Sequence, residues 1–238
     1  MRVVAIIPAL NEAENIGSVV ASVRAHVDQV IVADNGSDDG TADVARAAGA
    51  LVISEPRRGY GHACLAAIAA APPSDTLLFL DGDGSDDPAE APRVLEPLLS
   101  NEADLVIGSR QRGQRETDAQ PWHAVAGTRF CVWLMNRLVG TQATDLGPFR
   151  AISTSALSRL GMADPNYGWT VEMQIRATRA GLRVVEVPVT QRRRQHGRSK
   201  VSGTVRGTIG AGTKMLWVII TYARLTRKRL GPYVSRAT

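Results

Sequence analysis

The chain has 238 residues, a hydrophobic fraction of 44% and a formal net charge of +5. This length suits one large α/β domain or two small ones with a full core, and no segment has the composition of a disordered region. Residues 3–7 are strand-like and no basic, apolar and small-residue leader precedes them, so we expect a cytoplasmic protein. Cys64 and Cys131 stand in apolar surroundings, which predicts packed thiols and no disulfide.

Strand-like and helical segments alternate through the first half of the chain. The strand-like runs are residues 3–7, 30–33, 51–53, 77–80 and 104–107. Segments with helical spacing or small-residue composition separate them, at 16–27, 41–48, 63–71 and 88–99. This alternation predicts parallel βαβ units with right-handed crossovers, and therefore an α/β fold.

The regular alternation of strand-like and helical segments ends after Arg110. Residues 111–120 are polar and predict a loop, whereas 125–139 predict a helix whose apolar face includes Phe130, Trp133 and Leu134. The remaining expected elements are a turn and strand within 144–153, a helix over 169–180 and a strand over 184–189.

The most apolar run, residues 215–220, lies in the C-terminal tail. It is shorter than the roughly 20 apolar residues that cross a bilayer. We therefore predict a domain over residues 1–203 and an amphipathic helical tail over 204–238. The tail either packs on the domain or lies peripherally on the cytoplasmic face of a membrane.

Positive charge gathers at 191–200 and 224–229, whereas acidic residues lie mostly in the first half. The asymmetry predicts an anionic partner, either a phosphate or a membrane surface. No repeat period or zinc-ligand spacing typical of a nucleic-acid module occurs, so we expect no nucleic-acid partner.

Polar and acidic residues follow three predicted strands, at 8–12, at 34–37 and in the turn Asp81-Gly82-Asp83-Gly84. The carboxyl ends of parallel strands share one edge of the sheet, where open α/β folds bind ligands. Two carboxylates on a glycine-rich turn suit a hard divalent cation, which can then hold phosphate oxygens. The alternative is a solvated acidic turn before the next helix. No P-loop or G-x-G-x-x-G motif follows the first strand, which disfavours those nucleotide sites.

Six motifs follow one another along the chain in the order that is typical of one protein family. They are I-I-P-A-L-N-E-A-E-N-I at 6–16, V-A-D-N-G-S-D-D-G-T at 32–41, L-D-G-D-G-S-D-D-P at 80–88, G-S-R at 108–110, G-P-F-R at 147–150 and R-Q-H-G-R-S-K at 194–200. With them the chain resembles family-2 glycosyltransferases of the GT-A fold, and specifically the dolichol- or polyprenol-phosphate mannose synthase branch. The resemblance implies a Rossmann-like nucleotide-diphospho-sugar transferase sandwich with a mostly parallel central sheet, and makes residues 1–203 its catalytic domain.

The resemblance also implies roles for individual residues. The residues at the nucleoside would be Pro8, Ala9, Asn11, Glu12 and Asp34. Asp81 and Asp83 would form the D-x-D element that binds the sugar nucleotide with Mg²⁺ or Mn²⁺, with Ser85 on the metal side. The phosphate-binding positions would be Arg110, Arg129, Arg150 and Arg194, and Ser199 and Lys200 would close the acceptor loop. Asn35 replaces the second Asp of the common V-D-D-G-S signature, and we expect little consequence from that change.

The implied reaction moves a hexose from a nucleoside diphosphate to an acceptor, with inversion at the anomeric carbon. A lipid phosphate acceptor is already ionised and needs no strong base, whereas a hydroxyl acceptor needs one. Asp145 and Glu172 are the candidate bases, and Asp83 and Arg150 complete the expected catalytic set.

The expected donor is a GDP- or UDP-hexose, and the expected acceptor is a polyprenyl phosphate. A soluble or hydroxyl acceptor is the alternative within the same class. A non-catalytic nucleotide or polyanion binder is the alternative from another class, and it would need no paired aspartates. Contact with a membrane surface and self-association into a homo-oligomer both stay open.

Overall fold

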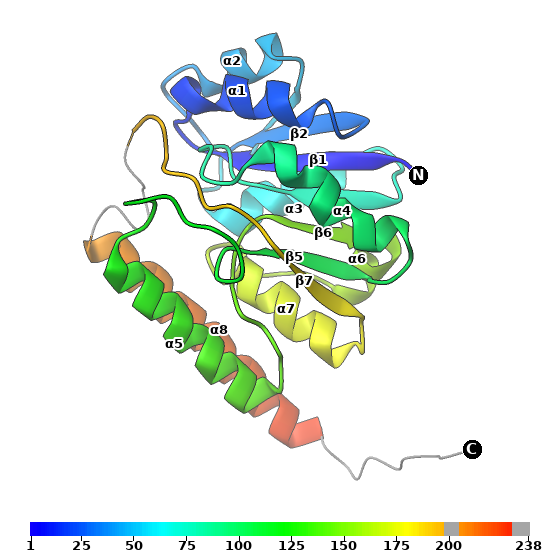
Figure 1. Cartoon of the computed structure of the whole chain (residues 1–238), viewed down its shortest axis with the longest axis vertical. Helices are drawn as coiled ribbons and strands as arrows, with labels where there is room; N and C mark the ends of the chain where they lie inside the picture. Colours follow the sequence, from blue (N-terminus) through cyan, green and yellow to red (C-terminus); the bar gives the residue numbers. More distant parts are fainter. Residues whose placement is uncertain (198–204, 230–238) are drawn as a thin grey trace.

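A seven-stranded sheet forms the centre of the structure, a computed structural model that describes residues 1–197 and 205–229 (Figure 1). The strands are β1 (Val3–Ala9), β2 (Gln29–Asp34), β3 (Leu51–Ser54), β4 (Thr76–Phe79), β5 (Leu105–Ser109), β6 (Arg150–Ser153) and β7 (Val184–Pro188). Their order across the sheet is β3-β2-β1-β4-β6-β5-β7, and β6 alone runs antiparallel to its two neighbours. The predicted α/β fold with a mostly parallel sheet is therefore confirmed.

Helices cover both faces of this sheet. They are α1 (Ala13–Val23), α2 (Thr41–Ala47), α3 (Tyr60–Ala70), α4 (Ala91–Leu99), α5 (Trp122–Val139), α6 (Thr154–Leu160), α7 (Trp169–Arg179) and α8 (Val205–Arg229), with a 3₁₀ turn, η1, at Pro88–Glu90. Apolar residues of α1, α2 and α4 pack on one face, and those of α3, α6 and α7 pack on the other.

Strand β1 lies between two helical layers, so the core consists of helices, sheet and helices. Its alternate residues Ala5 and Ile7 join the cluster under α1, while Val4 and Ile6 join the cluster over α3. All four are fully buried. A strand buried on both faces requires a continuous apolar run, which is what residues 3–7 supply.

A third apolar cluster lies beside the sheet, between α5, α7 and α8. Its buried members are Cys131, Val132, Met135, Leu146, Val171, Ile175, Val218 and Ile219. In Figure 1 the paired α5 and α8 run along one side of the domain. The C-terminal helix thus shares a core with the rest of the chain, which agrees with the packed alternative for the tail.

Two sequence expectations about side chains have different outcomes. Cys64 and Cys131 are buried free thiols, as predicted. Phe130 and Trp133 do not share the packed face of α5 with Leu134; both are exposed. The packed face of α5 is set by Cys131, Val132 and Met135, and the period of 3.6 residues places Phe130 and Trp133 on the opposite side.

Candidate functional site

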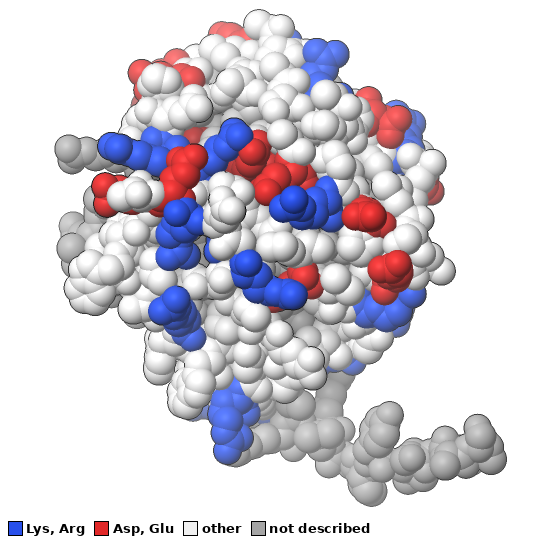
Figure 2. All heavy atoms as spheres, viewed as in Figure 1, with Lys and Arg blue, Asp and Glu red and all other residues white. Residues whose placement is uncertain are grey.

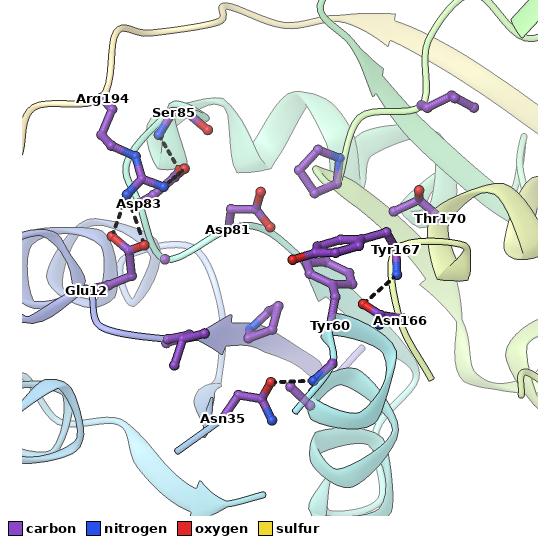
Figure 3. A pocket seen from close by; sticks show the side chains of 18 of the residues that line it. Glu12, Asn35, Tyr60, Asp81, Asp83, Ser85, Asn166, Tyr167, Thr170 and Arg194 are labelled. Carbon is purple, nitrogen blue, oxygen red and sulfur yellow. Dashed lines mark hydrogen bonds and ion pairs between the residues drawn. The ribbon is translucent and has the colours of Figure 1, made fainter. Parts of the chain in front are cut away.

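A pocket of about 460 Å³ opens where β1 and β4 end, with contributions from the end of β2 (Figure 3). This is the carboxyl edge of the parallel strands, the usual ligand position in an open α/β sheet. Eight sequence-predicted residues line it: Pro8, Ala9, Glu12, Asp81, Asp83, Ser85, Arg110 and Arg194. Its size falls within the range of small-molecule and cofactor sites.

The turn after β4 presents two carboxylates to this pocket. Asp81 Oδ1 is buried and has no hydrogen-bond partner among the described residues. Burial and the nearby charges of Asp83 and Asp86 raise the pKa of Asp81 to about 8. Burial alone would also raise the pKa of Asp83, but the Arg194 guanidinium and hydrogen bonds from Ser85 lower it below its usual value.

These oxygens fit a hard divalent cation. A buried carboxylate oxygen without a partner, beside a second carboxylate two residues away, is an oxygen donor set of the kind that Mg²⁺ and Mn²⁺ prefer. Among residues 1–197 and 205–229, no three His, Cys, Asp or Glu side chains are placed to hold an ion by themselves.

Glycine is required within this turn. A Cβ on Gly82 would lie 3.0 Å from Ile16 Cδ1 and 3.3 Å from Ile7 Cγ2, so a side chain there would press on the core. Gly84 has a φ of +72°, which side chains disfavour. The Ser85 N–H donates to Asp83 Oδ1 at 2.9 Å and fixes that carboxylate.

Arg194 reaches the turn from the segment after β7. Its guanidinium donates to Glu12 Oε1 at 3.0 Å and to Asp83 Oδ2 at 2.6 Å, and so bridges the ends of two strands (Figure 3). The backbone supports this crossing, because the Arg192 N–H donates to the Ser85 carbonyl at 2.9 Å. Arg194, which was predicted to bind phosphate, is thus paired with the carboxylates of Glu12 and Asp83 in this structure.

Arg110 lies on the other side of the turn. Its Nε donates to Asp86 Oδ1 at 2.9 Å, and its backbone N–H donates to Asp145 Oδ2 at 2.7 Å. Asp145 also accepts from the Leu146 N–H and is buried behind the pocket lining. Burial opposes the charge of Arg110, but Asp86 and Asp145 raise the pKa of Arg110 above its usual value.

Arg150 and Glu172 are buried and do not line the pocket. Arg150 donates to the Thr170 carbonyl at 3.0 Å and to the Gly147 carbonyl, and burial lowers its pKa to about 10. Glu172 accepts from the Asp164 N–H at 2.7 Å. Both side chains therefore brace backbone next to the pocket.

The nucleoside candidates Asn11 and Asp34 lie beside the pocket without lining it. The Asn11 N–H donates to Ser37 Oγ at 2.9 Å, and Asn11 Oδ1 accepts from the Asp38 N–H at 3.0 Å. Asp34 stands opposite Ala9 in the β1–β2 register and accepts from the Ser37 N–H at 3.3 Å. These bonds join the ends of β1 and β2 into one rim.

Arg129, another predicted phosphate-binding residue, is not brought to the pocket lining and is exposed on α5. Ser199 and Lys200 lie outside the described residues, so their expected place in the acceptor loop stays a prediction.

The sequence analysis missed the segment after β3, although its Arg58, Gly59 and Tyr60 line the pocket. The rule that strand ends meet at one edge would have found it, because a basic, glycine-rich run follows residues 51–53. Gly61 is needed for close approach, since its Cβ would lie 1.9 Å from the Asp164 carbonyl oxygen. Asn35 anchors this segment through bonds of 2.8 Å to the Glu55 carbonyl and from the Gly59 N–H.

A second missed group comes from the segment between α6 and α7 and from the tail. Asn166, Tyr167 and Met215 line the pocket as well. Figure 3 shows Tyr60 and Tyr167 across the pocket from Glu12 and Asp83. Only packing between distant segments brings these residues here, and no local pattern marks them.

A mostly parallel sheet of this order, with a paired-carboxylate turn at its carboxyl edge, is an α/β fold of the GT-A type. A crystal structure of glucosyl-3-phosphoglycerate synthase from Mycobacterium tuberculosis, in complex with Mn²⁺, uridine-diphosphate-glucose and phosphoglyceric acid, has the same fold, with a TM-score of 0.77. It is 25% identical, and the match covers 94% of this chain and 80% of that chain.

The family model described as Glycosyl transferase family 2 matches residues 4–161, so the chain belongs to that family and is a glycosyltransferase. The undecaprenyl-phosphate mannosyltransferase of Micrococcus luteus is 32% identical over 234 residues, 87% of this chain and 90% of that protein. The polyprenol monophosphomannose synthase of Mycolicibacterium smegmatis is 31% identical over 221 residues, 85% of this chain and 82% of that protein. The resemblance to this branch is therefore confirmed.

Proposed function

We propose that the protein transfers a hexose from a nucleoside diphosphate sugar to a polyprenyl phosphate, with inversion and with Mg²⁺ or Mn²⁺. One observation carries the cation-dependent part of the proposal: the unpartnered, buried Asp81 oxygen beside Asp83 on the pocket floor. The acceptor is inferred from the names of the two mannosyl-transferring relatives.

Asp81 and Asp83 would hold the cation, with Ser85 beside them. A divalent cation supplies positive charge to the diphosphate that leaves. The rim formed by residues 8–12 and Asp34 would hold the nucleoside. Arg110 and Arg194, already in the pocket lining, would orient the two anionic groups for in-line attack.

The placement of the two candidate bases supports an acceptor that is already ionised. Asp145 accepts two backbone N–H bonds behind the pocket lining, and Glu172 braces the backbone at 163–164. Neither carboxylate lines the pocket. A phosphate nucleophile needs no strong base, so this arrangement suits a lipid phosphate better than a hydroxyl group.

The test is a donor screen with the full chain. GDP- and UDP-hexoses are incubated with Mg²⁺ or Mn²⁺, and nucleoside diphosphate release is followed with and without a polyprenyl phosphate. We expect the lipid phosphate to stimulate release. Asp83→Asn should lower the rate roughly 100-fold or more, because it removes a cation ligand. Asp87→Asn is the matched control. Asp87 follows Asp83 closely in the chain, but it pairs with Arg192 and does not line the pocket.

Two results would contradict this proposal. If the wild type bound the donor equally well with the cation and with a chelator, and the Asp81→Asn and Asp83→Asn variants bound it equally well with the cation present, there would be no cation site. If a sugar or another hydroxyl acceptor stimulated nucleoside diphosphate release and lipid phosphate did not, the acceptor would be a hydroxyl compound and not a lipid phosphate.

A further inference from the structure

Tyr60, the first residue of α3, brings to the pocket a hydroxyl group that has no role in the proposed transfer so far. The residue lines the pocket, and its hydroxyl oxygen is buried without a hydrogen-bond partner among the described residues. Buried hydroxyl groups are usually hydrogen-bonded, because an unpaired one has given up its bonds to water without replacement. An unpaired hydroxyl at a ligand pocket therefore indicates a partner on the ligand.

The backbone around Tyr60 is held tightly in place. Gly59 has a φ of +144°, and a Cβ there would lie 2.3 Å from the Pro165 carbonyl oxygen. The Gly59 N–H donates to Asn35 Oδ1 at 2.8 Å, and the His62 N–H donates to the Pro165 carbonyl at 3.0 Å. The start of α3 cannot shift to give the hydroxyl another partner without breaking these contacts.

The aromatic ring of Tyr60 is held as well. It meets the Trp169 ring edge to face, with centroids 6.1 Å apart, and Trp169 in turn packs on Phe79 at 4.9 Å. Trp169 and Phe79 are fully buried. Because the ring rests on a rigid core, its hydroxyl is presented at one place, and binding a ligand there costs little side-chain entropy.

Asp81 is a neighbour of this hydroxyl but does not satisfy it. Burial raises the pKa of Asp81, and the Tyr60 hydroxyl offsets part of that rise, so the two groups lie close together. No hydrogen bond of ordinary length and geometry joins them, and Asp81 Oδ1 is also buried and unpartnered in the described part of the chain. With a cation on Asp81, the phenol would stand beside the diphosphate that the cation holds.

The pocket wall around Tyr60 carries neutral polar groups. Figure 3 shows three further residues of this kind on the same side of the pocket, namely Asn166, Tyr167 and Thr170. Arg194 and the carboxylates that it pairs with lie on the other side. Hydroxyl and amide groups beside aromatic rings suit an uncharged, hydroxyl-rich ligand. In a sugar nucleotide the hexose is such a group, and it is bonded directly to the diphosphate.

We propose that the Tyr60 hydroxyl hydrogen-bonds a hydroxyl group of the donor's hexose and so takes part in selecting the sugar. This inference rests on the proposed sugar-nucleotide donor and adds to it a residue that distinguishes one hexose from another. A phenol is protonated at neutral pH and can both donate and accept a hydrogen bond. A site built to bond a substrate hydroxyl rejects an analogue without it, because the protein group is then left unpaired.

The test is isothermal titration calorimetry of the full chain with Mn²⁺ and without any acceptor. The ligands are GDP, GDP-mannose, UDP and UDP-glucose, so that each sugar nucleotide is compared with its own nucleoside diphosphate. We expect Tyr60→Phe to weaken binding of the preferred sugar nucleotide about tenfold and to leave its nucleoside diphosphate unchanged.

Deoxy analogues of the preferred sugar nucleotide identify the hydroxyl group that Tyr60 contacts. Among donors that lack the 2-, 3-, 4- or 6-hydroxyl of the hexose, one should bind the wild type about tenfold more weakly than the parent donor. That same analogue should bind the Tyr60→Phe variant as well as the parent donor does, because the interaction is already absent. Loss of any other hydroxyl should affect both proteins equally.

Two controls separate a contact with the ligand from a structural role. Thr76→Val removes another buried hydroxyl without a partner in the described part of the chain, on β4 and outside the pocket lining, and should leave binding of all four ligands unchanged. The Tyr60→Phe variant should unfold at the same temperature as the wild type or at a higher one, because an unpaired hydroxyl contributes no bond to the folded chain.

Three results would overturn the assignment of Tyr60. Equal weakening of the nucleoside diphosphate and its sugar nucleotide would place the contact on the nucleotide or the cation. Unchanged binding of every ligand would show that the hydroxyl touches none of them, and a lower unfolding temperature with unchanged binding would show a structural role. If the wild type bound none of the four ligands, the proposed donor itself would be wrong, which is a separate outcome from a nucleotide that binds without help from Tyr60.

Discussion

Around the turn after β4, three of four carboxylates are paired with arginines from distant segments. Asp83 pairs with Arg194, Asp86 with Arg110 and Asp87 with Arg192. In the described part of the chain, no such ion pair is found for Asp81, and its burial together with the charges of Asp83 and Asp86 raises its pKa. A cation that binds Asp81 and Asp83 must therefore compete with the Arg194 guanidinium for Asp83.

This competition makes a prediction about Arg194. Replacing Arg194 with Gln should increase the affinity for Mn²⁺ in the absence of nucleotide about tenfold, because the cation no longer displaces a charged hydrogen-bond donor from Asp83. Isothermal titration calorimetry measures the change. Arg192→Gln is the control, since Arg192 pairs with Asp87, and it should leave Mn²⁺ affinity unaltered. Unchanged or weaker Mn²⁺ binding by the Arg194→Gln variant would contradict the competition.

At the scale of elements, α7 and α8 are joined by a polar cluster next to their apolar contact. The Tyr222 hydroxyl donates to Glu172 Oε1 at 2.6 Å, and Arg176 Nε donates to the same oxygen at 2.8 Å. Glu172 also accepts from the Asp164 N–H, in the segment that carries Tyr167. Glu172 therefore connects the tail helix to a pocket wall and is better explained as a positioning residue than as a base.

The Tyr222 hydrogen bond predicts a pH dependence. Burial and the bond to Glu172 raise the pKa of Tyr222 to about 12, from about 10 in the unfolded chain. A raised folded-state pKa means that its stabilisation is complete below about pH 10 and is lost as the pH rises toward about 12. Tyr222→Phe should lower the free energy of unfolding by about 1 kcal/mol at neutral pH.

Thermal unfolding of the wild type and the Tyr222→Phe variant, followed by circular dichroism across this range, measures the difference. Because every other titrating group is common to both proteins, their difference isolates Tyr222. The two stabilities should converge toward about pH 12. A difference that stays constant up to that pH would show that the hydroxyl contributes no proton-linked stability.

At the scale of the whole molecule, the question is whether residues 1–203 fold without the tail. Val218 and Ile219 of α8 are fully buried against α5 and α7, and each contributes roughly 1.5–3 kcal/mol. A chain that ends at residue 203 would expose Val171 and Ile175 to water. The proposed boundary at 203 thus separates a catalytic domain from a helix that covers part of its core.

Truncation tests this dependence directly. A chain of residues 1–203 should aggregate or unfold at markedly lower temperature than the full chain, as seen by size-exclusion chromatography and thermal unfolding. A chain that ends at residue 229 keeps α8 and is the control, with an expected unfolding temperature close to that of the full chain. If residues 1–203 were monomeric and equally stable, α8 would be a separable appendage.

The sequence alone determined the parts that depend on local pattern. The run of apolar residues at 3–7 requires a strand buried on both faces, and the D-G-D-G turn that follows 77–80 has to leave the carboxyl edge of a sheet. These patterns predicted the α/β fold and the aspartate pair in the pocket lining. The ordered motifs predicted the family, because their spacing is itself a property of the linear chain.

The tertiary structure decided which distant groups meet. Asp83 and Arg194 are 111 residues apart, and only the path of the segment after β7 brings them together. The same holds for Tyr167 and Met215 in the pocket wall, for Glu172 bound to the backbone, and for the exposed side of α5. A helical period shows that a helix has two faces, but which face is buried depends on the neighbours it packs against.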